Sequence, residues 1–90
     1  MFTLRTTNQF RKDYKVCRKR GLNLELINET FELLEKTGEV PAEYNPHKLR
    51  GNYSGYWECH LLPDWLLIWY CNKNKKEIHL VRTGTHSDLF

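Results

Sequence analysis

Four side chains suited to proton transfer or phosphate binding gather in the last third of the chain. They are His60, Asp64, Arg82 and His86, and His47 precedes them. Histidine acts as an acid or a base near neutral pH, and arginine offers a permanently charged fork to phosphate oxygens. Cleavage of RNA by its own 2′-hydroxyl needs a base for that hydroxyl, an acid for the departing 5′-oxygen and positive charge beside the phosphate. These residues therefore predict acid–base cleavage of a phosphodiester that requires no metal or other cofactor.

Each of these residues also has a structural explanation. His60 ends a predicted strand on its polar face, where a solvated histidine is almost as expected as a catalytic one, and Asp64 follows a proline as turn residues do. Arg82 lies in an apolar strand, where a charge needs a partner. His86 follows that strand among small polar residues, which favours a functional role. His79 alternates with core residues and is interpreted as structural or solvent-facing.

The first half of the chain predicts two helices joined by a very short connection. Thr6 or Thr7 can cap the first helix, and Gly21 can end it. Asn23 can cap the second, which ends at Thr37-Gly38. The apolar residues of the two helices recur at helical spacing: Phe10, Tyr14 and Cys17, then Leu24, Ile27, Phe31 and Leu34. The helices should therefore form a hairpin whose apolar faces cover a sheet.

Strands are predicted over residues 2–5, 56–60, 65–71 and 76–83. The third is continuously apolar, as expected of a central strand buried on both faces. The order β-α-α-β-β-β predicts an α+β fold, a two-helix hairpin packed on an antiparallel four-stranded sheet. Strict alternation places Arg82 on the core face of the last strand, so either a bulge or the end of the strand must turn it away.

Length and composition restrict the class of protein. Ninety residues allow one domain, residues 1–90. No apolar run is long enough for a membrane span, and the N-terminal residues do not resemble a signal peptide, so a cytoplasmic protein is expected. Cys17, Cys59 and Cys71 are an odd number without C-x-x-C spacing and are predicted to be reduced. Cys59 and His60 point to opposite faces of a strand, so no metal site is predicted there.

Basic residues are unevenly distributed. They are concentrated in the first helix and in the turn between the last two predicted strands. Those expected to bind substrate or ribosomal RNA are Arg11, Lys12, Lys15, Arg18, Lys19, Lys73 and Lys75. A basic surface on a small protein favours an anionic polymer as partner. The alternative is a set of solvated helix faces that partly pair with acidic residues of the second helix. Trp65 and Phe90 are candidates for stacking on RNA bases, although tryptophan in small domains is usually a packing residue.

Three separated segments resemble the YafQ branch of the RelE/ParE toxin superfamily. They are His47-x-Leu49-x-Gly51, then Gly55-Tyr56-x-x-x-His60-x-x-Pro63-Asp64-Trp65-Leu66-Leu67-Ile68, then Arg82-Thr83-Gly84-Thr85-His86-x-x-Leu89-Phe90. The resemblance covers essentially the whole chain. It implies the toxin of a type II toxin–antitoxin pair, a ribosome-dependent endoribonuclease that enters the decoding site and cuts messenger RNA within codons. A cognate antitoxin is then the expected protein partner.

The resemblance also implies roles for individual residues. The positions associated with activity in the family correspond to His47, His60, Asp64, Trp65, Arg82, His86 and Phe90. We expect His86 to be the general acid, and either His60 or Asp64 to be the base. Arg82, helped by His47, would stabilise the pentavalent phosphorus. Two alternatives remain: a ParE-like toxin that inhibits DNA gyrase, against which the histidines count, and a regulatory RNA-binding protein without catalysis.

Overall fold

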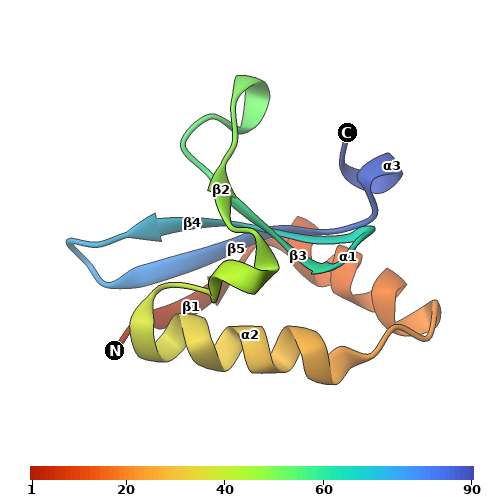
Figure 1. Cartoon of the computed structure of the whole chain (residues 1–90), viewed down its shortest axis with the longest axis horizontal. Coiled ribbons are helices and arrows are strands. Elements are labelled where there is room, and N and C mark those ends of the chain that lie inside the picture. The colour runs from red at the N-terminus through yellow and green to blue at the C-terminus, as the bar shows by residue number, and fades with distance from the viewer.

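The computed structural model describes residues 1–90. The strands are β1 (Thr3–Thr6), β2 (His47–Lys48), β3 (Trp57–Leu62), β4 (Trp65–Asn72) and β5 (Glu77–Gly84). The helices are α1 (Asn8–Lys19), α2 (Leu24–Thr37) and the short α3 (His86–Leu89), with single 3-10 turns η1 (Ala42–Tyr44) and η2 (Gly51–Tyr53). Helices α1 and α2 lie on one side of the sheet, whereas α3 and the segment from β2 to η2 project from the other (Figure 1). The predicted α+β class, with both long helices on one face, is confirmed.

The sheet differs from the prediction in two respects. It has five strands in the order β1-β5-β4-β3-β2, and β1 runs parallel to β5 while the other pairs are antiparallel. The predicted antiparallel four-stranded sheet is therefore wrong in strand number and in the direction of β1. Strand β2 has only two residues, too few for alternation to give a signal. The partner of β1 is chosen by the path of the whole chain, which local sequence does not encode.

Both long helices begin and end at residues that satisfy free backbone groups. The hydroxyl of Thr7 accepts a hydrogen bond from the Phe10 N–H at 2.9 Å, and the side chain of Asn23 accepts one from the first turn of α2 at 3.1 Å. Gly38 ends α2 with a φ of 75°. A Cβ at Gly38 would lie 2.6 Å from the Phe2 ring, so this position requires glycine for both the turn and the packing.

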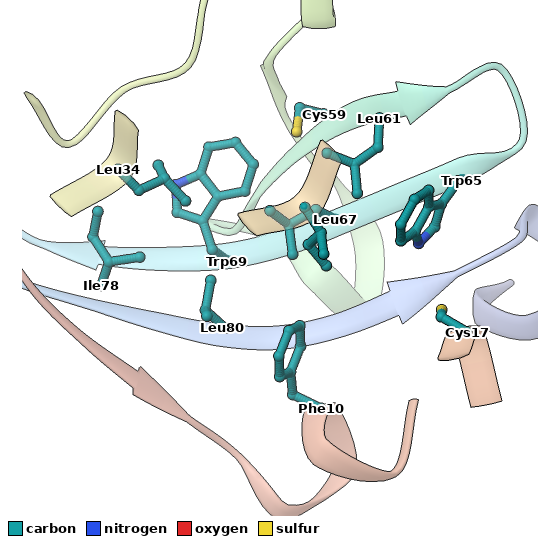
Figure 2. Close-up of a cluster of buried hydrophobic side chains, with 11 residues drawn as sticks. Phe10, Cys17, Leu34, Cys59, Leu61, Trp65, Leu67, Trp69, Ile78 and Leu80 are labelled. Atoms are coloured by element: carbon teal, nitrogen blue, oxygen red, sulfur yellow. The ribbon is translucent and has the colours of Figure 1, made fainter. Parts of the chain in front are cut away.

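The main core lies between the two long helices and the sheet face that they cover, which we call the covered face. Its buried side chains are Phe10, Cys17, Ile27, Leu34, Cys59, Leu61, Trp65, Leu67, Trp69, Ile78 and Leu80 (Figure 2). Burial raises the pKa of Cys59 to about 12, so this residue stays a thiol and acts as a packing residue. None of the helices is long and apolar enough to cross a bilayer.

The opposite side of the sheet, which we call the open face, carries a much smaller cluster. Leu66 and Ile68 of β4 pack there against Leu89 of α3, with Tyr53 and Tyr56 around them. Strand β4 is therefore buried on both faces, as its continuous apolar sequence predicts. This small cluster holds α3 and η2 against the open face. The candidate site residues lie beside these two segments.

Candidate active site

Three of the four histidines form a row on the open face. His47 comes from β2, His60 from β3 and His86 from the start of α3. The ring centroids of His47 and His60 are 6.2 Å apart, and those of His60 and His86 are 5.9 Å apart. The fold thus brings together three residues that are separated by up to 39 positions in the chain (47 to 86).

Asp64 holds His86 in a defined orientation. Its Oδ1 atom accepts hydrogen bonds from the His86 ring Nδ1 at 2.6 Å and from the His86 backbone N–H at 3.0 Å. These bonds, the backbone one foremost, hold the pKa of the Asp64 carboxyl below its usual value. An ionised carboxylate only accepts, so Nδ1 carries a proton and Nε2 of His86 is the nitrogen left for a ligand. Asp64 is therefore poorly suited to act as an independent base.

His47 and His60 have different surroundings. His47 Nδ1 donates to the Asn45 carbonyl oxygen at 3.0 Å, and its Nε2 lies 3.2 Å from Oε1 of Glu58. Glu58 is buried at 5% exposure, so a charge on His47 is balanced by a carboxylate that water hardly reaches. His60 Nδ1 is buried without a hydrogen-bond partner, which leaves Nε2 as the only nitrogen of that ring able to meet a ligand.

A bulge places Arg82 on the open face. Arg82 pairs with Ile68 and Leu80 with Trp69, so Val81 is an extra residue between the two pairs. Ile68 points to the open face, and its partner Arg82 does the same, whereas Leu80 stays in the main core. Of the two alternatives that the sequence left open, the bulge is the one present.

Asp13 of α1 fixes the guanidinium of Arg82. The Arg82 Nε and NH2 groups donate to Asp13 at 2.7 and 3.3 Å, and the backbone N–H of Thr83 donates to the same carboxylate at 3.2 Å. Asp13 is 8% exposed and raises the pKa of Arg82, which stays positively charged. Sequence analysis missed Asp13. Its signal was a carboxylate at i+3 from Phe10, on the apolar face of the helix.

Strand register relates Arg82 to the histidine row. Arg82, Ile68, Glu58 and His47 follow one another across four strands of the open face. With strands about 4.8 Å apart, the Arg82 backbone is roughly 10 Å from that of Glu58 and roughly 14 Å from that of His47. The predicted residues His47, His60, Asp64, Arg82 and His86 therefore share one surface.

Phe90 also lies at this surface. Its ring is 64% exposed and makes an edge contact with Tyr53, at a centroid distance of 5.6 Å. Tyr53, on η2, was not predicted from sequence, because a tyrosine in a turn-rich loop carries no periodic signal. The arrangement leaves the Phe90 ring accessible to a flat ligand.

Trp65 is not at the surface, so the prediction that it stacks on RNA bases is wrong. Its side chain is 1% exposed, and it lies on the covered face in the main core (Figure 2). The indole N–H donates to the Thr83 hydroxyl at 3.0 Å, which satisfies its only polar group. Along β4, Trp65, Leu67 and Trp69 face the main core, whereas Leu66 and Ile68 face the open side.

The predicted basic residues are exposed but are not gathered at the histidine row. Those of α1 are Arg11, Lys12, Lys15, Arg18 and Lys19. Lys73 and Lys75 lie in the turn between β4 and β5, at the far end of the sheet from α3 (Figure 1). At 3.3 Å a residue, the length of β4 separates them from Asp64 by roughly 25 Å. These residues form surfaces of their own around the site.

Solved structures that share this fold include bacterial toxins. A metal-bound toxin from Helicobacter pylori is 37% identical and superposes with a TM-score of 0.90, with 100% of each chain covered. A chain of the E. coli DinJ-YafQ toxin-antitoxin complex is 34% identical, with a TM-score of 0.88, 99% of this chain and 97% of that chain being covered. Fold and site together define a toxin of the kind that pairs with an antitoxin.

The family can be stated more narrowly. A family model described as "Bacterial toxin of type II toxin-antitoxin system, YafQ" matches residues 2–90. The mRNA interferase toxin YafQ of Escherichia coli strain K12 is 36% identical over 85 residues, which cover 93% of this chain and 90% of that protein. The chain belongs to the YafQ toxin family, and the resemblance stated from its sequence is confirmed. The bound metal belongs to the Helicobacter toxin; here no three His, Cys, Asp or Glu side chains are grouped to hold an ion.

Proposed function

We propose that this protein cleaves messenger RNA on the ribosome and so inhibits translation, as the toxin of a type II toxin–antitoxin system. The main observation behind the proposal is the row of three histidine rings on the same sheet face as Arg82, which Asp13 holds in place. The interferase name of the E. coli relative adds support and favours RNA cleavage over gyrase inhibition. Because ribosomes are its site of action, the protein works in the cytoplasm.

The reaction is an attack of the ribose 2′-oxygen on the adjacent phosphorus. A 2′-O–P bond forms, the P–O5′ bond breaks, and the products are a 2′,3′-cyclic phosphate and a 5′-hydroxyl end. His86 is the general acid: Asp64 binds its Nδ1 and stabilises the protonated ring, so Nε2 delivers the proton to the departing 5′-oxygen. With Asp64 engaged in this way, the base is His60, which takes the 2′-hydroxyl proton at Nε2.

Arg82 stabilises the charge that builds up on the phosphate oxygens. Asp13 keeps its guanidinium in one orientation before the substrate arrives, so little reorganisation is needed during the reaction. His47, whose ring lies 6.2 Å from that of His60, assists Arg82 in stabilising the phosphate charge. Phe90, exposed beside the row, stacks on a base next to the cut.

The exposed basic residues dock the protein on ribosomal RNA. Their distance from the histidine row suits a role in positioning, because phosphate contacts fix orientation without taking part in chemistry. Binding should weaken steeply with salt, as expected for a surface that releases counterions from RNA. A cognate antitoxin neutralises the protein, as the complex of E. coli YafQ with DinJ suggests.

Primer extension on a message that is being translated tests this function. Purified protein is added to translating ribosomes, and a parallel reaction contains the message without ribosomes. We expect new ends within codons only on ribosomes, and these ends should accept phosphate from polynucleotide kinase without prior phosphatase treatment. His86→Gln is the matched control, since the side chain is 54% exposed and its loss should not disturb folding.

Three results would contradict the proposal. One is an intact message with the native protein, and another is undiminished cutting by His86→Gln. The third is an intact message together with inhibition of supercoiling by DNA gyrase, which would establish the ParE-like alternative.

A further inference from the structure

A second hollow on the open face lies beyond the histidine row and takes no part in the mechanism above. It is lined by Thr7, Tyr56, Tyr70, His79 and Val81 and has a volume of about 400 Å³. We call it the tyrosine hollow. No other element covers it, because α1 and α2 pack on the covered face (Figure 1).

The walls of the tyrosine hollow are aromatic. The ring centroids of Tyr56 and Tyr70 are 6.0 Å apart, and those of Tyr70 and His79 are 6.1 Å apart. Tyr70 is 40% exposed, which is unusual for a large ring in the middle of a central strand. Exposed rings on a sheet are the surface on which unpaired bases stack, with little regard to sequence.

The hollow continues the active site. Phe90 contacts Tyr53, and Tyr53 contacts Tyr56 at a centroid distance of 6.1 Å. A series of ring contacts therefore leads from Phe90, in the segment that follows His86, to Tyr70 and His79. An RNA strand bound at Phe90 would therefore contact aromatic side chains along its path to the hollow.

The spacing suits a nearby nucleotide. His60 pairs with Leu66, and Tyr70 lies four residues farther along β4, so the hollow lies roughly 13 Å from His60 of the histidine row. Stacked nucleotides rise about 3.4 Å each. A base in the hollow would then belong to a nucleotide about four positions from the cut.

The charges around the hollow suit a polyanion. Tyr70 also lines a neighbouring depression together with Lys48 and Lys73, whose side chains can reach phosphates. The acidic group nearest to His79 is Glu77, at 3.4 Å. Glu77 is already paired with Arg5 at 2.8 Å, which lowers the pKa of its carboxyl and offsets its charge.

We propose that the tyrosine hollow binds an unpaired base of the RNA strand that the histidine row cleaves, about four nucleotides from the scissile phosphate. This inference rests on the function proposed above. The exposed ring of Tyr70 stacks on the base, with the His79 ring packed beside it. The hollow then binds the message independently of the basic residues that contact the ribosome.

Binding of a strand that cannot be cut tests the hollow without relying on catalysis. The probe is a single-stranded 2′-O-methyl oligoadenylate, which lacks the attacking hydroxyl, followed by fluorescence anisotropy at low salt. We expect Tyr70→Ala to weaken binding about tenfold and Tyr70→Phe to leave it unchanged, because stacking requires the ring. The same strand in a duplex should bind no better to the native protein than to Tyr70→Ala. Equal affinity of the native protein and Tyr70→Ala for the single strand would overturn the proposal.

Cleavage on ribosomes supplies the second arm. Tyr70→Ala should need about tenfold more protein for half-maximal cutting, with the rate at saturation retained, since the hollow is remote from the reacting atoms. If the native protein cuts nothing, the proposed function fails, and the oligoadenylate experiment alone decides the hollow. If Tyr70→Ala cuts like the native protein at every concentration but binds the antitoxin more weakly, the hollow is an antitoxin surface and the inference is wrong.

Discussion

The two faces of the sheet differ in how much apolar surface they bury and in how their polar groups are hydrogen-bonded. The covered face and the helices α1 and α2 together contribute eleven buried side chains to the main core. On this face, Thr83 accepts from the Trp65 indole and donates to the Leu66 carbonyl at 2.7 Å. The open face has a core of only three buried residues and carries nearly all of the chemistry.

The open face buries a polar atom that has no hydrogen-bond partner, Nδ1 of His60. It also buries Glu58, which is 5% exposed and pairs with His47. Such groups lower stability, because a buried donor or acceptor without a hydrogen bond loses its interaction with water. The comparison indicates that the covered face supplies most of the stability of this small protein. The open face lowers that stability in exchange for reactive side chains.

Removing the unpartnered histidine tests that contrast most strongly. His60→Leu should lower the rate of cleavage on ribosomes by about 10²–10⁴-fold, because a proton-transfer group is lost. The same change should raise the free energy of unfolding by about 1 kcal/mol, since an apolar side chain replaces a buried nitrogen without a partner. Urea denaturation and primer extension measure the two effects. A variant that is less stable than the native protein, or one that still cuts, would show that the faces do not differ in this way.

Sequence predicted the covered face better than the open one. The helices were predicted from periodic residues such as Phe10, Cys17 and Ile27, and the same residues form the core. Their caps, Thr7 and Asn23, act through local backbone bonds and are therefore visible in local sequence. Because the helices are buried along one continuous face, the apolar periodicity of the sequence matches the residues found in the core.

The open face depends on contacts between distant segments. Asp13 supports Arg82 from 69 residues away, and Glu58 meets His47 only because β2 pairs with β3. The sequence does not separate a stacking role from a packing role for Trp65, because an apolar strand buried on both sides has no alternation that identifies its faces. The family resemblance names the candidate residues of the site, and only the structure shows that Asp64 accepts hydrogen bonds from the ring and the backbone of His86.

Trp65 offers the matching test on the covered face. Trp65→Ala should lower the free energy of unfolding by about 3–5 kcal/mol, as expected for a large buried aromatic side chain. Trp65→Phe should cost less, because most of the ring volume is kept and only the bond to Thr83 is lost. Under conditions where it is folded, Trp65→Phe should cut RNA at the native rate. Impaired cutting by a well-folded Trp65→Phe would show that Trp65 contributes to RNA binding or cleavage.

Asp13 joins the two faces, and its effect should be intermediate. Asp13→Asn should lower the free energy of unfolding by about 1–3 kcal/mol, since hydrogen bonds to charged groups are among the stronger ones. It should also slow cleavage about 10–100-fold, because Arg82 is no longer held in place.

A double-mutant comparison separates positioning from general damage. In the Arg82→Ala background, Asp13→Asn should cause little further loss of cleavage rate, because the group that Asp13 positions is already absent. The same additional loss of rate in both backgrounds would mean that Asp13 acts on cleavage without Arg82.

The smallest expected effect concerns the attachment of α3, which carries His86. Asp88 accepts hydrogen bonds from Arg20 at 2.6 and 3.1 Å and from the Thr85 N–H at 2.9 Å. Arg20 above all holds the pKa of Asp88 well below its ordinary value of 3.8. A carboxyl with a lowered pKa stabilises the folded state while it is ionised. Its contribution is therefore complete above about pH 4 and is lost as the pH falls toward the folded-state pKa.

Asp88→Asn should accordingly lower the free energy of unfolding by at most about 1 kcal/mol at neutral pH, because the Arg20 pair is partly exposed and screened by solvent. The difference from the native protein should shrink in strongly acidic buffer and also in high salt. Urea denaturation across a pH series measures it. Because α3 packs on the open face through Leu89 alone among its buried residues, this variant should also slow cleavage slightly by loosening His86. A stability difference that stays constant through the acid range would show that Asp88 acts through packing, and that charge has no part in holding the open face together.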